Sequence, residues 1–225
     1  MSFNIAIDGP AGAGKSTIAK KLAEKISFIY VDTGAMYRAM AYYFLTHQIS
    51  AVDEAALEAA CSEINVELAY EQGVQKVLLN GTDISGEIRK EEVGKMASAT
   101  SKYGFVRQKL LHLQRDIAAK NNVIMDGRDI GTCILPDAQL KVYLTASVRT
   151  RALRRYQELE EKGERCELAL IEKDIEERDY QDMHREIAPL KVAGDAKVLD
   201  SSDLTIEEVV DRMYQMALEA GLGKD

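Results

Sequence analysis

The sequence of 225 residues predicts an α/β fold built on a mostly parallel sheet. Short apolar, β-branched runs recur along the chain, and stretches with the apolar spacing of helices separate them. The runs alternate little with polar residues, as expected for strands that are buried on both faces of a sheet. Strands that alternate with helices imply crossover connections and parallel neighbours. The length suits one such domain with insertions.

Five strands and six helices follow from this pattern. The strands are the runs "FNIAID", "FIYVD", "NNVIMD", "LKVYLTA" and "AKVLD", at residues 3–8, 28–32, 121–126, 140–146 and 196–200. Helical spacing predicts helices at residues 16–25, 35–46, 91–120 with a break near Tyr103, 148–161, 167–186 and 205–220.

One segment departs from the alternation. Residues 64–88, "INVELAYEQGVQKVLLNGTDISGEI", contain turn signals at Gln72–Gly73 and at Asn80–Gly81. Short apolar runs separated by such turns are typical of antiparallel strands. We therefore expect a small antiparallel insertion on one edge of the domain.

The composition argues against several classes of protein. A net charge of −8 disfavours a general nucleic-acid binder. No apolar run approaches the roughly 18 residues of a spanning helix, and "MSFNIAIDG" reads as a strand instead of an export signal. Cys61, Cys133 and Cys166 show neither zinc spacing nor a disulfide framework. We expect a cytoplasmic protein with no nucleic-acid or membrane partner.

The segment "GPAGAGKST" joins the first strand to the first helix and fills the pattern G-x-x-x-x-G-K-[ST]. Glycines let the backbone approach a ligand closely, and N–H groups at a helix start favour an anion. In such a loop Lys15 reaches the β- and γ-phosphates of a nucleotide and Ser16 binds Mg²⁺. An ordinary turn is the alternative, but the strand before it and the helix after it are the context that a phosphate loop requires.

Two further motifs follow predicted strands, at the sheet edge where open parallel sheets bind ligands. In "DTGAMYR", Tyr37 could pack on a ring and Arg38 could form a forked contact with phosphate. In "MDGRDIGT", Asp126 could orient Mg²⁺ through water, and Arg128 with Asp129 could contact the edge of a base. The alternatives are a capped helix start with a solvated Arg38, and a tight turn held by an Asp–Arg pair.

Two predicted helices carry clustered arginines. Arg151, Arg154 and Arg155 fall at i, i+3 and i+4 on one face, which suits a lid over the nucleotide; a solvated face is the alternative. A second cluster, at i, i+4 and i+7, consists of Arg178, Asp182 and Arg185. The two guanidiniums could bind phosphate while the carboxylate accepts from a sugar hydroxyl; a ladder of ion pairs along the helix is the alternative.

These clusters contain much positive charge and no obvious general base. A hydroxyl acceptor usually needs a carboxylate that takes its proton. A phosphate monoester already carries a nucleophilic oxyanion at neutral pH, so the difficulty is repulsion between two anions, which arginines and Mg²⁺ offset. The pattern therefore favours phosphoryl transfer to a phosphate.

The motifs "GPAGAGKST", "DTGAMYRA", "LNGTDISGEIR", "DGRDIGT" and "ERDYQDMHREIAPL" have the order and spacing of bacterial cytidylate kinases, which the chain resembles over essentially its whole length. The resemblance implies a P-loop kinase fold, with a five-stranded parallel sheet flanked by helices, a small antiparallel insertion and a helical lid. The single domain would comprise a core at residues 1–60, 96–148 and 186–225, an insertion that binds the acceptor at about 61–95, and a lid at about 149–185.

The resemblance also implies the reaction, in which ATP phosphorylates CMP or dCMP with Mg²⁺ as cofactor and without a general base. Nothing in the sequence suggests an obligate dimer, so a monomer is expected. A P-loop kinase of UMP, AMP or a small hydroxy-acid stays open as an alternative. A nucleotide-dependent switch is disfavoured, because the sequence lacks the Asn-Lys-x-Asp of GTPases. GTPases also carry Asp-x-x-Gly after a strand, and here Asp126 is followed at once by Gly127 and then Arg128, which breaks that spacing.

The site residues are implied in the same way. ATP would be bound by Gly9, Pro10, Ala11, Gly12, Ala13, Gly14, Lys15, Ser16 and Thr17. CMP would be bound by Thr33, Tyr37, Arg38, Ser98, Arg107, Arg128, Asp129, Arg178, Asp182 and Arg185. Cytosine would be contacted by Ser98, Arg128 and Asp129. The sugar would be contacted by Arg178 and Asp182, and the acceptor phosphate would be held by Arg38, Arg107 and Arg185. The catalytic residues would be Lys15, Arg128, Arg151, Arg155, Arg178 and Arg185. Mg²⁺ would be bound by Ser16 and, through water, by Asp126.

Overall fold

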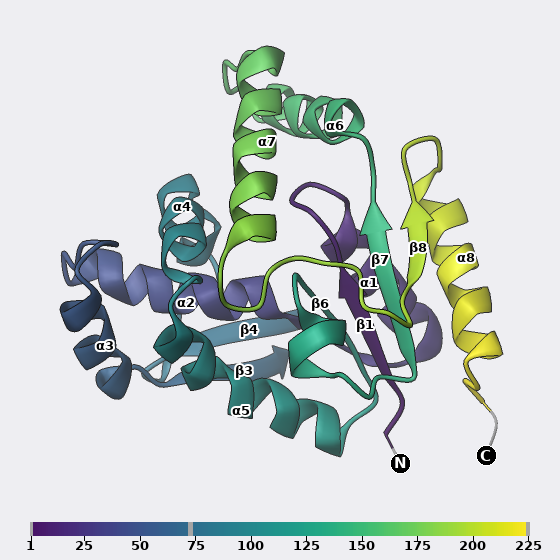
Figure 1. Cartoon of the computed structure of the whole chain (residues 1–225), viewed down its shortest axis with the longest axis horizontal. Helices are drawn as coiled ribbons and strands as arrows, with labels where there is room; N and C mark the ends of the chain where they lie inside the picture. Colours follow the sequence, from purple (N-terminus) through teal and green to yellow (C-terminus); the bar gives the residue numbers. More distant parts are fainter. Residues whose placement is uncertain (1, 72–73, 224–225) are drawn as a thin grey trace. The chain divides into compact units, whose positions relative to one another are not determined.

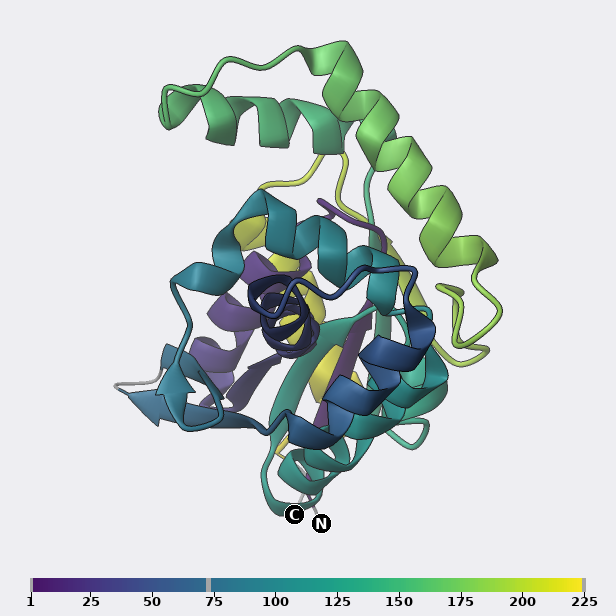
Figure 2. The ribbon, with the colours of Figure 1, turned by 90° about the vertical axis from the view of Figure 1, so that its left-hand side faces the viewer.

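A computed structural model describes residues 2–71 and 74–223 (Figures 1 and 2). The chain forms two compact units. The first unit contains the described residues up to Tyr30 together with those from Asn122 onward, and the second contains Val31–Asn121. The proposed insertion at 61–95 lies within the second unit and the proposed lid at 149–185 within the first; these boundaries stay predictions.

The described residues include a five-stranded sheet in the order β2-β6-β1-β7-β8, which belongs to the first unit except for the last two residues of β2. The strands are β1 (Asn4–Asp8), β2 (Ile29–Asp32), β6 (Val123–Gly127), β7 (Leu140–Thr145) and β8 (Lys197–Asp200). β1 is parallel to both β6 and β7, with Asn4 opposite Val123 and Ile5 opposite Leu140, and β7 is parallel to β8. All five predicted strands are confirmed to within one or two residues at their ends, and the predicted α/β class is confirmed with them.

Four helices complete the first unit: α1 (Lys15–Ile26), α6 (Val148–Glu161), α7 (Leu168–His184) and α8 (Ile206–Glu219). α1 and α8 pack together over a core that includes Ile7, Leu22, Leu144 and Met213. α8 begins at a capping box, in which Thr205 accepts from the Glu208 N–H and the Glu208 carboxylate accepts from the Thr205 N–H.

α6 and α7 form a helical hairpin in the first unit (Figure 2). Their packing is a small apolar cluster of its own, centred on Ala152, Ile171 and Ile175. The predicted helices at 148–161 and 167–186 are thereby confirmed, with α7 ending two residues early. A buried ion pair between Arg151 of α6 and Asp179 of α7 adds to this apolar contact.

In its described residues the second unit contains four helices and a small sheet. The helices are α2 (Thr33–Thr46), α3 (Glu54–Glu63), α4 (Glu91–Thr100) and α5 (Gly104–Lys120), with a 3₁₀ turn η1 (Glu87–Arg89) before α4. Its core includes Met36, Met40, Phe44 and Leu110. The expected break near Tyr103 is confirmed, whereas α3 was not expected; Asp53 caps it by accepting from the Ala56 N–H.

The small sheet confirms the predicted antiparallel insertion. β3 (Val66–Glu71), β4 (Val74–Leu79) and β5 (Thr82–Asp83) pair antiparallel in that order. α2 packs against β3 and β4 of this sheet. Asn80 and Gly81 form the second turn with φ values of 49° and 81°, as two-residue hairpin loops require. The first turn signal, Gln72–Gly73, lies outside the described residues.

No helix in the described ranges is long and apolar enough to cross a membrane.

Candidate active site

The phosphate loop follows β1 and leads directly into α1. Gly9 has a φ of 153°, and a Cβ there would stand 2.0 Å from the carbonyl oxygen of Leu144, so only glycine fits between β1 and β7. Gly14 caps α1 with a φ of 82°, a left-handed conformation that glycine adopts without strain. The loop sequence is therefore dictated by the backbone path that brings N–H groups to the start of α1.

Lys15 is buried, and its Nζ donates to the carbonyl oxygens of Gly9 and Pro10, each at 2.8 Å. Burial lowers the pKa of Lys15 to about 7, and the charge of Arg128 acts in the same direction while Asp126 and Asp8 oppose it. A buried ammonium group at the loop would be stabilised by a nearby anion. Its contact with nucleotide phosphates stays a prediction.

Ser16 and Asp126 lie together beside the loop. The Ser16 hydroxyl donates to Oδ2 of Asp126 at 2.9 Å, and the Tyr30 hydroxyl donates to Oδ1 at 3.0 Å. Asp126 is buried at the end of β6. These hydroxyl and carboxylate oxygens are the hard donors that Mg²⁺ prefers, and in phosphoryl-transfer sites one or two protein oxygens suffice because phosphates and water complete the shell. The pair therefore fits the metal expected from the sequence.

Asp8, at the end of β1, is a buried carboxylate that the sequence reasoning missed. Its two oxygens accept from the N–H groups of Ile130 and Gly131 at 2.7 and 2.8 Å. Burial raises the pKa of Asp8 to about 6, although these two hydrogen bonds lower it. Asp8 fixes the π-helical turn η2 (Ile130–Ile134), which follows the "GRD" residues. A charged residue at the end of an otherwise apolar strand was the available signal.

Four predicted acceptor residues form one ion-pair network. Arg128 Nε donates to Asp182 Oδ2 at 2.7 Å, Arg185 lies 3.8 Å from Asp182 Oδ1, and Arg185 donates to Asp129 Oδ1 at 3.3 Å. Burial acts to raise the pKa of Asp182, but Arg128, Arg178 and Arg185 together lower it. The structure thus brings residues from the end of β6 and from α7 into one cluster of donors and acceptors.

Arg151, Arg154 and Arg155, the clustered arginines of α6, have separate partners. Arg151 is buried and donates to the carbonyl oxygens of Ala146 and Ala11 and to Asp179 Oδ2, the last at 2.6 Å. Arg154 donates to the Ser201 carbonyl at 2.7 Å, and Arg155 to Glu158 at 3.2 Å. Arg151 therefore connects the phosphate loop, β7 and α7, and Asp179 is a second functional candidate that the sequence reasoning missed.

Arg178, a further predicted acceptor residue, lies on α7 in the first unit. The second unit carries the other five. The buried Thr33 is the first residue of α2, and the guanidinium of Arg107 lies 5.5 Å from the centre of the Tyr37 ring. Arg38 donates to the carbonyl of Ile88 at 3.1 Å. Ser98 is partly exposed on α4. Within this unit the structure links Tyr37 to Arg107.

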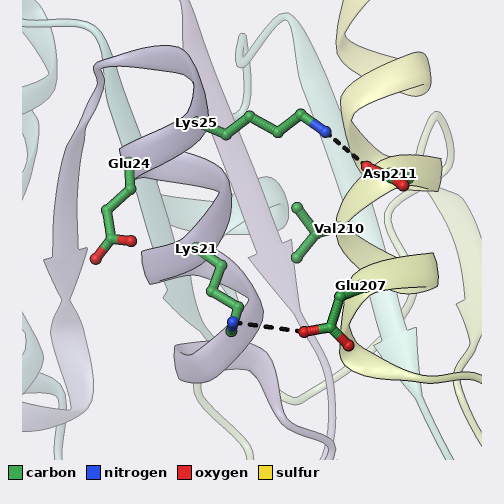
Figure 3. Close-up of a pocket in the computed structure, with 6 residues that line it drawn as sticks. All are labelled: Lys21, Glu24, Lys25, Glu207, Val210 and Asp211. Atoms are coloured by element: carbon green, nitrogen blue, oxygen red, sulfur yellow. Dashed lines mark hydrogen bonds and ion pairs between the residues drawn. The ribbon is translucent and has the colours of Figure 1, made fainter.

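Figure 3 shows a groove between α1 and α8, lined by Lys21, Glu24, Lys25, Glu207, Val210 and Asp211. Lys25 and Asp211 are 2.6 Å apart, and Lys21 and Glu207 are 3.6 Å apart. The two lysines face carboxylates across the groove, and these exposed ion pairs join α1 to α8. The groove is separate from the phosphate loop and holds none of the predicted site residues.

A glycine loop between a buried parallel strand and a helix, with a buried lysine and a serine–aspartate pair, defines a P-loop nucleotide-binding protein.

Comparisons with known proteins identify the family. The family model described as "Cytidylate kinase" matches residues 5–219. The chain is 49% identical over 214 residues to a cytidylate kinase of Lactobacillus gasseri, which covers 95% of this chain and 93% of that protein. It is 48% identical over 214 residues to a cytidylate kinase of Caldicellulosiruptor saccharolyticus, with 95% of each covered. The chain belongs to the cytidylate kinase family, so it is an enzyme of the kinase class.

A solved structure of an uncharacterised protein from Eubacterium ventriosum has the same fold. The TM-score is 0.52 at 12% identity, and the match covers 95% of this chain and 97% of that chain.

Proposed function

We propose that this protein transfers the γ-phosphoryl group of ATP to CMP or dCMP and releases ADP with CDP or dCDP. Family membership supports this reaction, and one structural observation carries it: the network of Arg128, Asp182, Arg185 and Asp129. Two guanidiniums and two carboxylates in one buried cluster offer the forked donors and paired acceptors that a nucleoside monophosphate requires. UMP, AMP and a hydroxy-acid are disfavoured as acceptors.

ATP is bound by the loop residues 9–17. The N–H groups at the start of α1 and the ammonium of Lys15 contact its phosphates, and the binding energy comes mainly from these charges. Ser16 and Asp126 hold Mg²⁺, Asp126 through water. When bound, the metal neutralises charge that develops on the phosphate oxygens.

CMP is bound by the acceptor residues that the motifs indicate. Ser98, Arg128 and Asp129 contact the cytosine, and Arg178 and Asp182 contact the sugar. Arg38, Arg107 and Arg185 hold the phosphate, with Thr33 and Tyr37 completing the acceptor set. This division of roles follows the motif positions and is supported by the pairing of Arg128 with Asp182.

The chain's own residues act by position and charge. The acceptor phosphate is already an oxyanion, so its attack needs no base; it needs alignment with the donor and relief of repulsion. Lys15, Arg128, Arg178 and Arg185 supply positive charge for both. Arg151 and Arg155 belong to the lid at 149–185, whose closure excludes water so that ATP is not hydrolysed when CMP is absent.

The test measures ADP release from ATP and Mg²⁺ across CMP, dCMP, UMP, AMP and a small hydroxy-acid. CMP and dCMP should give the highest kcat/KM. Arg128→Ala and Asp129→Ala should lower kcat/KM for CMP far more than they alter the KM for ATP, whereas Lys197→Ala, which removes an exposed ion pair with Glu219, should change neither. If both acceptor-site variants stay within about threefold of wild type for CMP, the assignment of the base contacts is wrong.

We further propose that the enzyme acts as a monomer in the cytoplasm, with ATP and (d)CMP as its small-molecule partners and no nucleic acid or membrane. Sedimentation with and without both substrates tests the monomer, and a stable dimer would contradict it.

A further inference from the structure

Gly94 stands in the middle of α4 and is buried. Its N–H donates to the Lys90 carbonyl at 3.2 Å, so its backbone is ordinary helix. Glycine in a helix interior costs about 1 kcal/mol relative to alanine. No backbone conformation explains its presence, since no left-handed φ is found at this position.

The neighbour of Gly94 is the guanidinium of Arg38. A Cβ on Gly94 would stand 2.9 Å from one terminal nitrogen of Arg38, 3.0 Å from the other and 3.2 Å from the central carbon. Separations under 3.0 Å do not occur for real Cβ atoms, so one of the two groups would have to move. The guanidinium is the far end of a flexible side chain, whereas the α4 backbone is held by packing against α2.

A second contact fixes the same guanidinium. Arg38 donates to the carbonyl of Ile88, a fully buried residue of η1, at 3.1 Å. The Arg38 guanidinium is therefore held between the backbone of Gly94 in α4 and the carbonyl of Ile88 in η1. A displacement of a substrate-positioning group by about 1 Å can lower the reaction rate about a hundredfold.

We propose that Gly94 is a positioning residue whose missing side chain sets the orientation of the Arg38 guanidinium, and thereby the recognition of the acceptor phosphate. The inference rests on the proposed function, because it takes Arg38 as a ligand of that phosphate. It assigns a specificity role to a residue that has no side chain of its own. The Arg38 guanidinium occupies the space that a side chain at position 94 would fill, and this accounts for a glycine in the interior of α4.

The experiment compares Gly94→Ala with Gly86→Ala. Gly86 has helical φ and ψ of −74° and −44° and no atom within 4 Å of its Cβ position. It is therefore a control glycine at which an added methyl group would displace no side chain. Gly94→Ala should raise the KM for CMP about tenfold or more and leave the KM for ATP within about twofold. Its urea midpoint should stay equal or rise, since alanine favours helix. Gly86→Ala should keep wild-type kinetics.

A double-mutant cycle separates positioning from general damage to α4, which also carries Ser98. In an Arg38→Ala background, adding Gly94→Ala should change kcat/KM for CMP by less than about twofold, because the group that it displaces is gone. An equal loss in both backgrounds, or a Gly94→Ala enzyme within about twofold of wild type, would overturn the inference. Wild-type enzyme that fails to phosphorylate CMP would instead overturn the proposed function, and the inference with it.

Discussion

Arg128 donates through Nε to Oδ2 of Asp182 over 2.7 Å, and this bond joins the segment after β6 to α7. Both side chains are largely buried, with 19% and 9% exposed. The ion pair therefore depends on both partners, because removing one leaves the other charge buried without compensation.

Asp182→Asn should lower kcat/KM for CMP by about a hundredfold or more, because it removes the charge that holds Arg128 and Arg185 together. The KM for ATP should change by less than about threefold. Steady-state kinetics with each substrate varied in turn measure both values. Glu172→Gln, which removes the partner of the exposed Arg149, is the matched control and should keep wild-type values. Equal losses for both substrates would contradict the assignment of Asp182 to the acceptor.

Asp179→Asn should destabilise the fold by about 3–5 kcal/mol, because it leaves the Arg151 guanidinium buried without its carboxylate. The double variant Arg151→Met, Asp179→Leu should recover part of that loss, since no buried charge remains. Urea unfolding of the single and double variants gives the free energies. A double variant no more stable than Asp179→Asn would contradict the explanation that the loss comes from an uncompensated Arg151 charge.

Ser16→Ala should raise the Mg²⁺ concentration for half-maximal activity several-fold, because the proposed metal site loses the hydroxyl that lies beside Asp126. Titration of activity with Mg²⁺ at saturating ATP measures the shift. Ser62→Ala, which removes a hydroxyl bonded only locally to the Ala59 carbonyl on α3, serves as the control. An unchanged Mg²⁺ requirement would remove Ser16 from the metal site.

Asp8→Asn should change how stability depends on pH. The folded-state pKa of Asp8 is raised to about 6 from 3.8, so between pH 4 and 6 the folded protein keeps a proton that the unfolded chain has released. Stability from this group is therefore fully present below about pH 4 and is lost as pH rises to 6, by about 3 kcal/mol at most.

Urea unfolding at several pH values between 4.5 and 7.5 measures this dependence. The free energy of unfolding of the wild type, relative to Asp8→Asn, should fall across the window and level off above pH 6. Parallel pH profiles for the two proteins would show that Asp8 does not titrate as the structure indicates.

The sheet and its flanking helices were predictable because their signals are local. Apolar runs mark β1, β6 and β7, and the phosphate loop carries its pattern within nine residues. α3 was missed although Asp53 and Glu54 mark its start, because its apolar spacing is weak and nothing in the sequence shows which face is buried. Tertiary packing of Leu57 and Cys61 supplies that information.

The finer chemistry of the site was not predictable because its partners are distant in the chain. Arg151 and Arg155 look alike in the sequence, yet one is buried against Ala11 and Asp179 while the other is half-exposed beside Glu158. The shape of η2 depends on Asp8, which lies 122 positions before Ile130. Spacing along a helix indicates a shared face and says nothing about what each side chain meets there.

The position of β1 in the sheet has a consequence for how the protein is made. Its neighbours, β6 and β7, lie far along the chain, with Ile5 opposite both Ile124 and Leu140. A ribosome therefore releases this strand long before either neighbour exists, and the nascent chain exposes an unpaired apolar segment until then. Such distant pairings slow folding and invite aggregation. The phosphate loop follows β1, and its Gly9 lies against Leu144, so the loop cannot take its final path before β7 has been synthesised.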